Sequence, residues 1–483
     1  MTTGGRSTAG YAWIGIDLGT SGCRALAIDE GGRELASAST PLPEPLSTAP
    51  GQYAQDPELW WQAVLGILTQ LGAALPDREP VAICLDATSA TLLLATPNGK
   101  LCGPALMYND RRAVAEVALI DRVAPTDSPA RGPSASLAKL MHLSRQYPHC
   151  TAALALHQAD WIIGRLTGHH GVSDWNNALK LGYDAERLCW PDWVSALIPD
   201  GIQLPHIVSP GDPIGPLDAT LANRLGWPSS IQVLAGTTDS TAAVIAAGAT
   251  EPGDAVTCLG STLVLKILSE RPVTASAFGI YSHRFGDAWL VGGASNSGGA
   301  VLRRFFSDAE IVSLSLRIDP ERPSGLDYYP LIGPGERFPR NDPDLAPRLS
   351  PRSSEPRDFL QGLLEGIARI EAEGYARLAE LGAPLPRRIT SIGGGAANPT
   401  WTAMRARILG IPVTSAEHQD AAYGVALLAL RRTGPAPDTS DRMETSRAGL
   451  VSPVRSTKKD RFKPPGLRCG SWKDRQGRER REE

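Results

Sequence analysis

The same local pattern occurs near the start of each half of the chain: an apolar strand, a turn of glycine and hydroxyl residues, and a second apolar strand. The first turn lies in DLGTSG, residues 17–22, and the second in CLGSTL, residues 258–263. Apolar runs joined by short glycine-containing turns are typical of β-hairpins. The repeat therefore predicts two domains that present the same hairpin, and only the first turn has a carboxylate, Asp17.

The chain length agrees with this division, because 483 residues exceed what one compact core usually holds. Mixed strand and helix patterns continue to about residue 249, and Glu251-Pro252-Gly253-Asp254 is typical of a joint. The strand–turn–strand pattern then begins again. We expect an α/β protein with a first domain at residues 11–249 and a second at residues 250–434.

The composition argues against several classes of protein. Hydrophobic residues make up 42% and charged residues 20%, as in ordinary globular chains, and a formal net charge of −3 gives no reason to expect a specific nucleic acid partner. No apolar run approaches the ~20 residues that span a membrane. Seven cysteines without a C-x-x-C pair favour reduced, mostly buried thiols in a cytoplasmic protein over a disulfide framework or a zinc site.

The two ends of the chain differ from the rest. Residues 1–10 lack the apolar segment of a secretory signal, so we expect a flexible N-terminus, with a transit-peptide remnant as the alternative. Residues 435–483 lack periodic apolar residues and are rich in arginine and lysine near the end, which predicts a disordered basic tail. A solvated appendage is favoured over contact with nucleic acid or anionic lipid.

Local signals place three further elements. Asp56-Pro57-Glu58 combines an N-cap residue, a proline at the first helical position and an acid in the first turn, so a helix begins here. Residues 81–85 are predicted to form a short buried strand. Asp86 follows that strand and could equally cap the next turn, so it is left out of the predicted site. Residues 358–381 are predicted to form a helix.

The paired hairpins suit an anion that lies between two domains. Backbone N–H and hydroxyl groups in such turns are donors, and polyphosphate is the ligand we expect. Asp17 would then bind Mg²⁺ on the phosphates, directly or through water. The alternative is that the glycines and Thr20 only satisfy the geometry of the turn, with Asp17 hydrogen-bonded to backbone N–H groups.

A third segment, VLAGTTDSTAAVIAAG at residues 233–248, places Asp239 between a strand and a helix. A carboxylate at a helix N-terminus stays ionised and can accept a proton from a hydroxyl group. The alternative is an ordinary N-cap aspartate.

A fourth segment, IGGGAANPTW at residues 392–401, places glycines at the carboxyl end of a strand and before a helix that ends at Gly410. Such glycines let a ligand approach the backbone beside a helix N-terminus. The chain has no G-x-G-x-x-G, G-x-x-x-x-G-K-[ST], H-R-D or H-E-x-x-H motif. A dinucleotide-binding Rossmann site, a P-loop, a protein-kinase site and a zinc hydrolase are therefore all poor interpretations.

Together with GGASNSGGA at residues 292–300, these segments resemble, in this order, the FGGY carbohydrate kinases of the actin-like ATPase superfamily. The resemblance implies two RNase-H-like domains around a central cleft, with ATP mainly on the second domain and the sugar mainly on the first. Further stretches, among them CLDATSATLLL, QADWI and SGLDYYPL, are most similar to the D-ribulose kinases of cyanobacteria and plants.

The resemblance also implies roles for single residues. Asp239 matches the base that takes the proton from the terminal hydroxyl of the pentulose, and Asp17 the acid near Mg²⁺ and the sugar. Ser89 would reach a sugar hydroxyl, and Asp174 and Asn176 are further sugar-side candidates, with structural capping as their alternative. The nucleotide would be bound at the phosphate hairpins, the adenosine loop and an adenine-stacking wall, formed by Thr20, Ser21, Gly260, Ser261, Thr262, Gly394, Gly395, Asn398 and Trp401.

The function implied is that of an ATP-dependent kinase that makes D-ribulose 5-phosphate, as a monomer or homodimer with no membrane partner. D-Xylulose or another ketose or polyol is the alternative substrate, although the DATSAT segment lacks the histidine that xylulokinases have there. A sugar or nucleotide sensor without turnover, or an ATPase that cycles nucleotide, is the alternative from another class.

Overall fold

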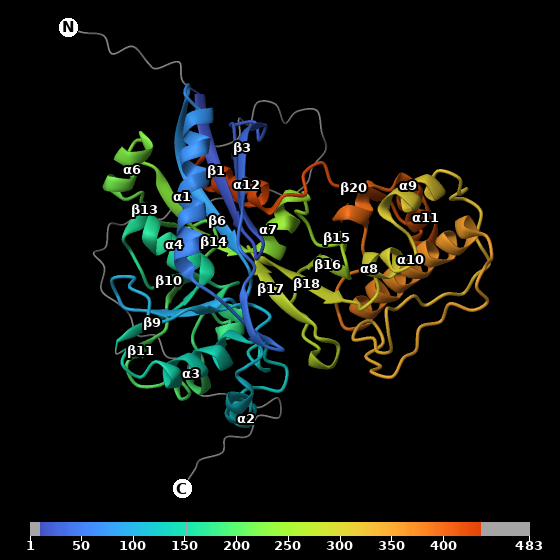
Figure 1. Ribbon diagram of the computed structural model, residues 1–483, viewed down its shortest axis with the longest axis horizontal. Helices are drawn as coiled ribbons and strands as arrows, with labels where there is room; N and C mark the ends of the chain where they lie inside the picture. Colours follow the sequence, from blue (N-terminus) through green and yellow to red (C-terminus); the bar gives the residue numbers. More distant parts are fainter. Residues whose placement is uncertain (1–9, 151, 436–483) are drawn as a thin grey trace.

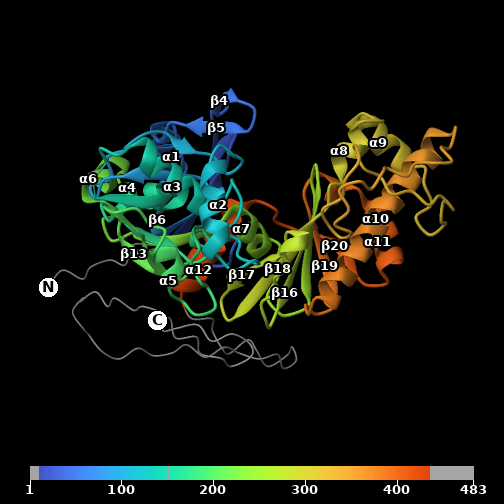
Figure 2. The same ribbon diagram turned by 90° about the horizontal axis from the view of Figure 1, so that it is seen from below.

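The computed structural model describes residues 10–150 and 152–435, which form two lobes. Figure 1 shows the first lobe, from β1 to α7, beside the second, from β15 to α11, and Figure 2 shows the same two groups from below. The predicted flexible N-terminus and basic tail lie almost entirely outside the described residues. No helix in the described part is both long and apolar enough to cross a membrane.

The first lobe is built on a six-stranded sheet with the order β13-β14-β6-β1-β2-β3. β1, β2 and β3 are antiparallel neighbours, whereas β6 and β14 run parallel to β1. The bounds of its strands are β1 (Gly10–Leu18), β2 (Gly22–Ile28), β3 (Glu34–Pro41), β6 (Arg78–Ala87), β13 (Pro213–Pro216) and β14 (Gln232–Thr238).

A second sheet in this lobe has the order β11-β9-β7-β8-β5-β4, and a short pair joins β10 to β12. The bounds are β4 (Leu46–Ala49), β5 (Gln52–Gln55), β7 (Leu92–Ala95), β8 (Ala105–Leu106), β9 (Ala153–His157), β10 (Val172–Asp174), β11 (Ile202–Gln203) and β12 (His206–Val208). The helices are α1 (Pro57–Ala74), α2 (Val114–Val123), α3 (Ser136–Gln146), α4 (Gln158–Thr167), η1 (Ala178–Leu181), α5 (Asp192–Ser195), α6 (Ala219–Leu225) and α7 (Asp239–Ala246).

The sheet of the second lobe has the order β17-β18-β16-β15-β19-β20, and its last five strands repeat the arrangement of β3-β2-β1-β6-β14 in the first lobe. The sixth strand differs, because β13 lies beside β14 whereas β17 lies beside β18. β15, β16 and β18 are antiparallel neighbours, and β19 and β20 run parallel to β15. The bounds are β15 (Asp254–Leu259), β16 (Leu263–Ser269), η2 (Ser276–Phe278), β17 (Tyr281–Phe285), β18 (Ala288–Ala294), α8 (Gly299–Arg303), α9 (Asp308–Ser315), α10 (Pro356–Glu380), β19 (Arg388–Ile392), η3 (Gly394–Ala397), α11 (Pro399–Leu409), β20 (Val413–Ser415) and α12 (Ala421–Thr433).

This repetition confirms the prediction of a two-domain α/β fold with RNase-H-like sheets, each beginning with the same hairpin. The helix predicted at Asp56 is also confirmed: α1 begins at Pro57, and the Asp56 side chain accepts a hydrogen bond from the N–H of Glu58 at 3.0 Å. The expected second domain, residues 250–434, includes one helix that returns to the first. α12 lies among first-lobe elements in Figure 1 and buries Ala422, Val425 and Ala426 against β1, β6 and α7.

The prediction of reduced thiols is wrong for Cys102 and Cys150, which are joined by a disulfide. The two cysteines are 48 positions apart in sequence, so no short spacing pattern marks them, and the fold brings their Cα atoms to 5.8 Å. Cys23 and Cys84 are buried free thiols, as predicted.

The joint between the domains is held by Asp254. Its carboxylate accepts hydrogen bonds from Arg388 at 2.8 and 2.9 Å and from the N–H groups of Thr250 and Glu251, both at 3.0 Å. Burial alone would raise the pKa of Asp254, but these donors, Arg388 foremost, lower it to about 2.

We predict that Asp254→Asn lowers the free energy of unfolding by about 1 kcal/mol at pH 7. A pKa lowered to about 2 corresponds to ~2 kcal/mol, part of which solvent screening of the exposed Arg388 removes. Because the pKa is lowered in the folded state, this stabilisation is present above about pH 4 and is lost as the pH falls toward 2. Urea unfolding of wild type and variant at pH 7 and pH 3 measures this effect. The difference between their free energies of unfolding should be smaller at pH 3, and an equal difference at both pH values would contradict the assignment.

Candidate active site

Two acidic side chains lie at the carboxyl ends of neighbouring parallel strands. The register of β1 and β6 pairs Asp17 with Asp86, and β14 brings Thr237 opposite Asp86 from the other side. Asp86 is fully buried, and no N–H or hydroxyl group of a described residue reaches either of its carboxylate oxygens. The interpretation of Asp86 as a turn cap is therefore wrong: it lies inside β6 and forms a pair with Asp17.

The environment of this pair favours a bound cation. Burial, with the charges of Asp239 and Asp420, raises the pKa of Asp17 to about 6, and burial beside Asp17 raises the pKa of Asp86 well above its usual value. No group of three or more His, Cys, Asp or Glu side chains in the described residues could hold a metal by itself. The two carboxylates fit a Mg²⁺ ion that completes its shell with phosphate oxygens and water.

Asp239 occupies the first turn of α7, directly after β14, as the sequence predicts. It is half-buried, and its Oδ1 accepts a hydrogen bond from the N–H of Ser240 at 2.6 Å. Burial raises the pKa of Asp239, whereas the Ser240 N–H and the positive charges of Lys180 and Lys266 oppose that rise. The carboxylate is thus accessible and placed where it can accept a proton.

Both predicted hairpin turns are present. In the first, the N–H of Gly19 donates to the carbonyl of Gly22 at 3.0 Å, and Thr20 and Ser21 occupy the turn. In the second, the start of α8 packs on the turn, because Gly299 and Ala300 donate to the carbonyls of Gly260 and Ser261 at 2.9 and 3.0 Å.

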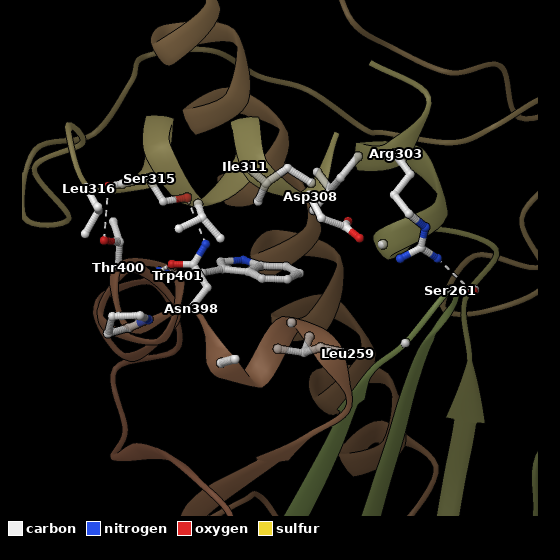
Figure 3. A pocket seen from close by; sticks show the side chains of 18 residues that line it. Leu259, Ser261, Arg303, Asp308, Ile311, Ser315, Leu316, Asn398, Thr400 and Trp401 are labelled. Carbon is white, nitrogen blue, oxygen red and sulfur yellow. Dashed lines mark hydrogen bonds between the residues drawn. The ribbon is translucent and has the colours of Figure 1, made fainter. Parts of the chain in front are cut away.

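The second turn also carries a cation that the sequence analysis missed. Arg303, at the end of α8, donates to the Ser261 hydroxyl at 2.9 Å. Figure 3 shows the guanidinium group pointing toward Ser261 at one side of a cavity. An arginine beside a hydroxyl-rich turn strengthens the case for a phosphate ligand at this place.

The cavity lies in the second lobe and has a volume of about 450 Å³. The parallel strands β15 and β19 end side by side, so Gly260 and Ser261 of one turn and Gly394 and Gly395 of the other form one side of it, and α9 forms the other. Thr262, the remaining predicted residue of the second hairpin, does not line the cavity. Its lining is mostly apolar and includes Leu259, Leu302, Ile311, Val312 and Leu316. A nucleotide fits this cavity: its flat nucleobase would lie against the apolar lining, and its phosphates would extend toward Arg303.

Asn398 and Trp401, two residues predicted to bind the nucleotide, stabilise the wall of the cavity. The Asn398 side chain caps α11 by accepting from the N–H of Trp401 at 3.0 Å and donates to the Ser315 hydroxyl at 2.8 Å. Trp401 is only 2% exposed, and its indole N–H donates to the carbonyl of Leu364 at 3.1 Å. A Cβ at Gly395 would lie 2.6 Å from the indole ring. Trp401 therefore supports the glycine loop, and its stacking on adenine stays a prediction.

Gly394 offers a test of the cavity. No atom lies within 4 Å of a Cβ built there, so a leucine side chain would fit the fold and project into the cavity. We predict that Gly394→Leu raises the KM for ATP about tenfold or more, with the sugar KM unchanged. Gly66→Leu is the matched control, since Gly66 of α1 also has open space around it. An unchanged ATP KM would show that the nucleotide binds elsewhere.

The turn after β6 holds Ser89 with a free hydroxyl. Thr88 hydrogen-bonds Thr91 and Gln158 at 2.6 and 2.7 Å, whereas the buried Ser89 Oγ has no partner among the described residues. Lys139 of α3, fully buried, donates to the carbonyl of Ala90 at 2.8 Å and so anchors the turn. A polar atom left free by a well-anchored turn is available to a ligand.

The Asp174 carboxylate makes its hydrogen bonds to neighbouring residues of its own turn. Its carboxylate accepts from the N–H groups of Asn176 and Asn177 at 2.8 and 3.1 Å and from the Asn177 side chain at 2.6 Å. The capping alternative therefore describes its contacts. Asn176 is better placed for a ligand: it donates to Thr237, two residues before Asp239, at 3.0 Å, and its Oδ1 has no partner among the described residues.

The chain belongs to the FGGY family of carbohydrate kinases. Models of the N-terminal and C-terminal domains of that family match residues 12–246 and 255–432. The two lobes thus correspond to the two domains of that family.

Among curated relatives, a xylulose kinase of Escherichia coli is 26% identical over 420 residues, 82% of this chain and 85% of the relative. A gluconokinase of Bacillus licheniformis is 23% identical and covers 87% of both chains. A solved structure titled a "xyloylose kinase" from Brucella ovis has a TM-score of 0.78 at 26% identity, with 88% and 90% covered. Plasmodium falciparum glycerol kinase with ADP, 18% identical over the same shares, also has a TM-score of 0.78 and shares the fold.

Proposed function

We propose that this chain transfers the γ-phosphoryl group of ATP to the terminal hydroxyl of a pentulose. The observation that carries the proposal is the convergence of Asp17, Asp86 and Asp239 at the ends of neighbouring strands, opposite a second lobe with a glycine-lined cavity. A sensor or a nucleotide-cycling ATPase has no need of a base positioned for a sugar hydroxyl.

Each residue set has a distinct part in this reaction. Asp239 accepts the proton of the sugar hydroxyl. The two hairpins and Arg303 hold the phosphates of ATP, and the cavity holds its adenine and ribose. Asp17 and Asp86 would hold Mg²⁺, which, when bound, offsets negative charge on the phosphates. Positioning and charge neutralisation then account for most of the rate.

D-Ribulose is the substrate we propose, from the resemblance of the segment around Ser89 to D-ribulose kinases. D-Xylulose is the second candidate, because curated relatives of similar length are named xylulose kinases. Measuring kcat/KM with Mg-ATP for D-ribulose, D-xylulose, L-ribulose, ribitol and glycerol separates them. Preference for D-ribulose supports the first candidate, preference for D-xylulose replaces it, and activity on a non-pentulose alone refutes both.

Ser89→Ala tests whether the turn after β6 contacts the sugar. Loss of one hydrogen bond to a hydroxyl should lower kcat/KM for the preferred pentulose about tenfold and leave the ATP KM unchanged. Ser47→Ala, on the exposed strand β4, is the matched control. Equal activity of the Ser89 and Ser47 variants would remove Ser89 from the sugar site.

A further inference from the structure

Two lysines, one from each lobe, lie against the same tyrosine. Lys180 belongs to η1 of the first lobe, and its Nζ is 5.4 Å from the centre of the Tyr281 ring. Lys266 belongs to β16 of the second lobe. It pairs with Gly292 of β18, which in turn pairs with Tyr281 of β17, so the three form one row across the sheet.

Because Gly292 has no side chain, the Lys266 side chain can lie across the neighbouring strand β18. A Cβ at Gly292 would lie only 2.5 Å from Cδ of Lys266. The stem of Lys266 therefore lies over Gly292 and extends toward Tyr281, which Lys180 contacts from the other lobe. We call Lys180 and Lys266 the interdomain lysine pair.

The lobes are in contact beside this pair. Trp175 and Leu179 of the first lobe pack with Trp289 of the second. The Arg284 guanidinium lies 5.1 Å from the Trp175 ring and 5.8 Å from the Trp289 ring, and the Trp175 indole donates to the Arg284 carbonyl at 3.2 Å. The lysine pair is thus held in a partly dehydrated region where its charge acts strongly.

The two lysines share two ionisable neighbours, Asp239 and Tyr281, and their charges lower the pKa of the Tyr281 hydroxyl. Asp239 is the carboxylate that interacts electrostatically with both lysines. Burial lowers the pKa of Lys266, and Lys180 lowers it further, while Tyr281 and Asp239 oppose the shift. His283, next in the same strand face as Tyr281, has a pKa well below its usual value because of burial and the two lysines, so it adds no charge. Two lysine side chains and one carboxylate at the contact between the lobes are a set of groups that suits an anionic ligand.

We propose that Lys180 and Lys266 bind the phosphoryl group as it passes to the sugar and then hold the phosphate of the product. This inference rests on the proposed function. The terminal oxygen of the sugar bonds to the γ-phosphorus, the bond from that phosphorus to the β,γ-bridging oxygen breaks, ADP leaves, and the hydroxyl proton moves to Asp239. A neutral sugar does not require two ammonium groups, whereas the transferred phosphoryl group carries the charge that they complement.

Kinetics of Lys180→Met and Lys266→Met test the proposal. We expect kcat to fall about 100-fold in each, with the KM values for sugar and ATP within about twofold of wild type. Lys266→Arg, which keeps the charge, should recover part of kcat. Lys100→Met, at an exposed turn, is the matched control. Unchanged kcat, or a raised sugar KM with normal kcat, would overturn the proposal.

Calorimetric titration with inorganic phosphate in the presence of Mg-ADP gives a readout that does not depend on the sugar. Wild type should bind phosphate, and each methionine variant should bind it at least about tenfold more weakly. Equal affinity in wild type and variants would overturn the role of the lysines, even if the kinase activity is confirmed. Failure of every sugar to be phosphorylated would refute the proposed function separately, while the phosphate titration would still report on the lysine pair.

Discussion

Asp239→Asn should lower kcat for phosphoryl transfer by about 10,000-fold, the upper range for loss of a general base. Asparagine keeps the size of the side chain and still accepts from the Ser240 N–H, but it cannot take the hydroxyl proton. Since the nucleotide cavity lies in the other lobe, the Kd for ATP should stay within about twofold. Steady-state kinetics and equilibrium nucleotide binding measure the two quantities.

The control for this variant is Asp287→Asn, the same change at the exposed turn between β17 and β18. It should leave kcat unaffected. Substantial transfer by the Asp239 variant would mean that another group is the base. Weakened nucleotide binding in parallel with kcat would instead indicate that the substitution disturbs the fold.

Asp17→Asn should lower kcat about 1,000-fold, equivalent to ~4 kcal/mol of transition-state stabilisation. The physical reason is the loss of one of two carboxylates that would hold Mg²⁺. Activity should depend on a higher Mg²⁺ concentration than in wild type and should rise as Mg²⁺ is added. A titration of activity against Mg²⁺ measures both effects.

Thermal unfolding without Mg²⁺ separates this loss from misfolding. Burial and repulsion by neighbouring carboxylates raise the pKa of Asp17, so removing its charge relieves an unfavourable interaction. The Asp17 variant should be at least as stable as wild type. A variant that is much less stable, or one with an unchanged Mg²⁺ dependence, would contradict the assignment of Asp17 to the metal.

Local patterns were enough to predict the elements that present the site. The turns at residues 19–22 and 260–262, the helix that begins at Asp239 and the helix after Asn398 each have a sequence signal within a few residues. The repeated hairpin also predicted that both domains present the same strand–turn–strand unit, and the antiparallel pairs β1–β2 and β15–β16 confirm it.

Features that depend on strand order or on contact between lobes were missed. Asp86 joins the site because β6 lies beside β1, and the available signal was the match between two apolar strands, WIGID and VAICLD, that both end in aspartate. Lys266 and Tyr281 align only across β18. Arg303 meets Ser261 only after α8 packs on the hairpin turn. Neither of the last two contacts has a spacing that a single sequence reveals.

The most direct test of the central claim is the fate of the γ-phosphoryl group. Wild-type protein, Mg²⁺, D-ribulose and ATP labelled in the γ-phosphate are mixed for one turnover, and the labelled products are separated. The structure predicts that the label appears in a pentulose phosphate, and that omission of the sugar leaves it in ATP. Label that appears as inorganic phosphate at the same rate with and without sugar would contradict the claim and indicate an ATPase instead.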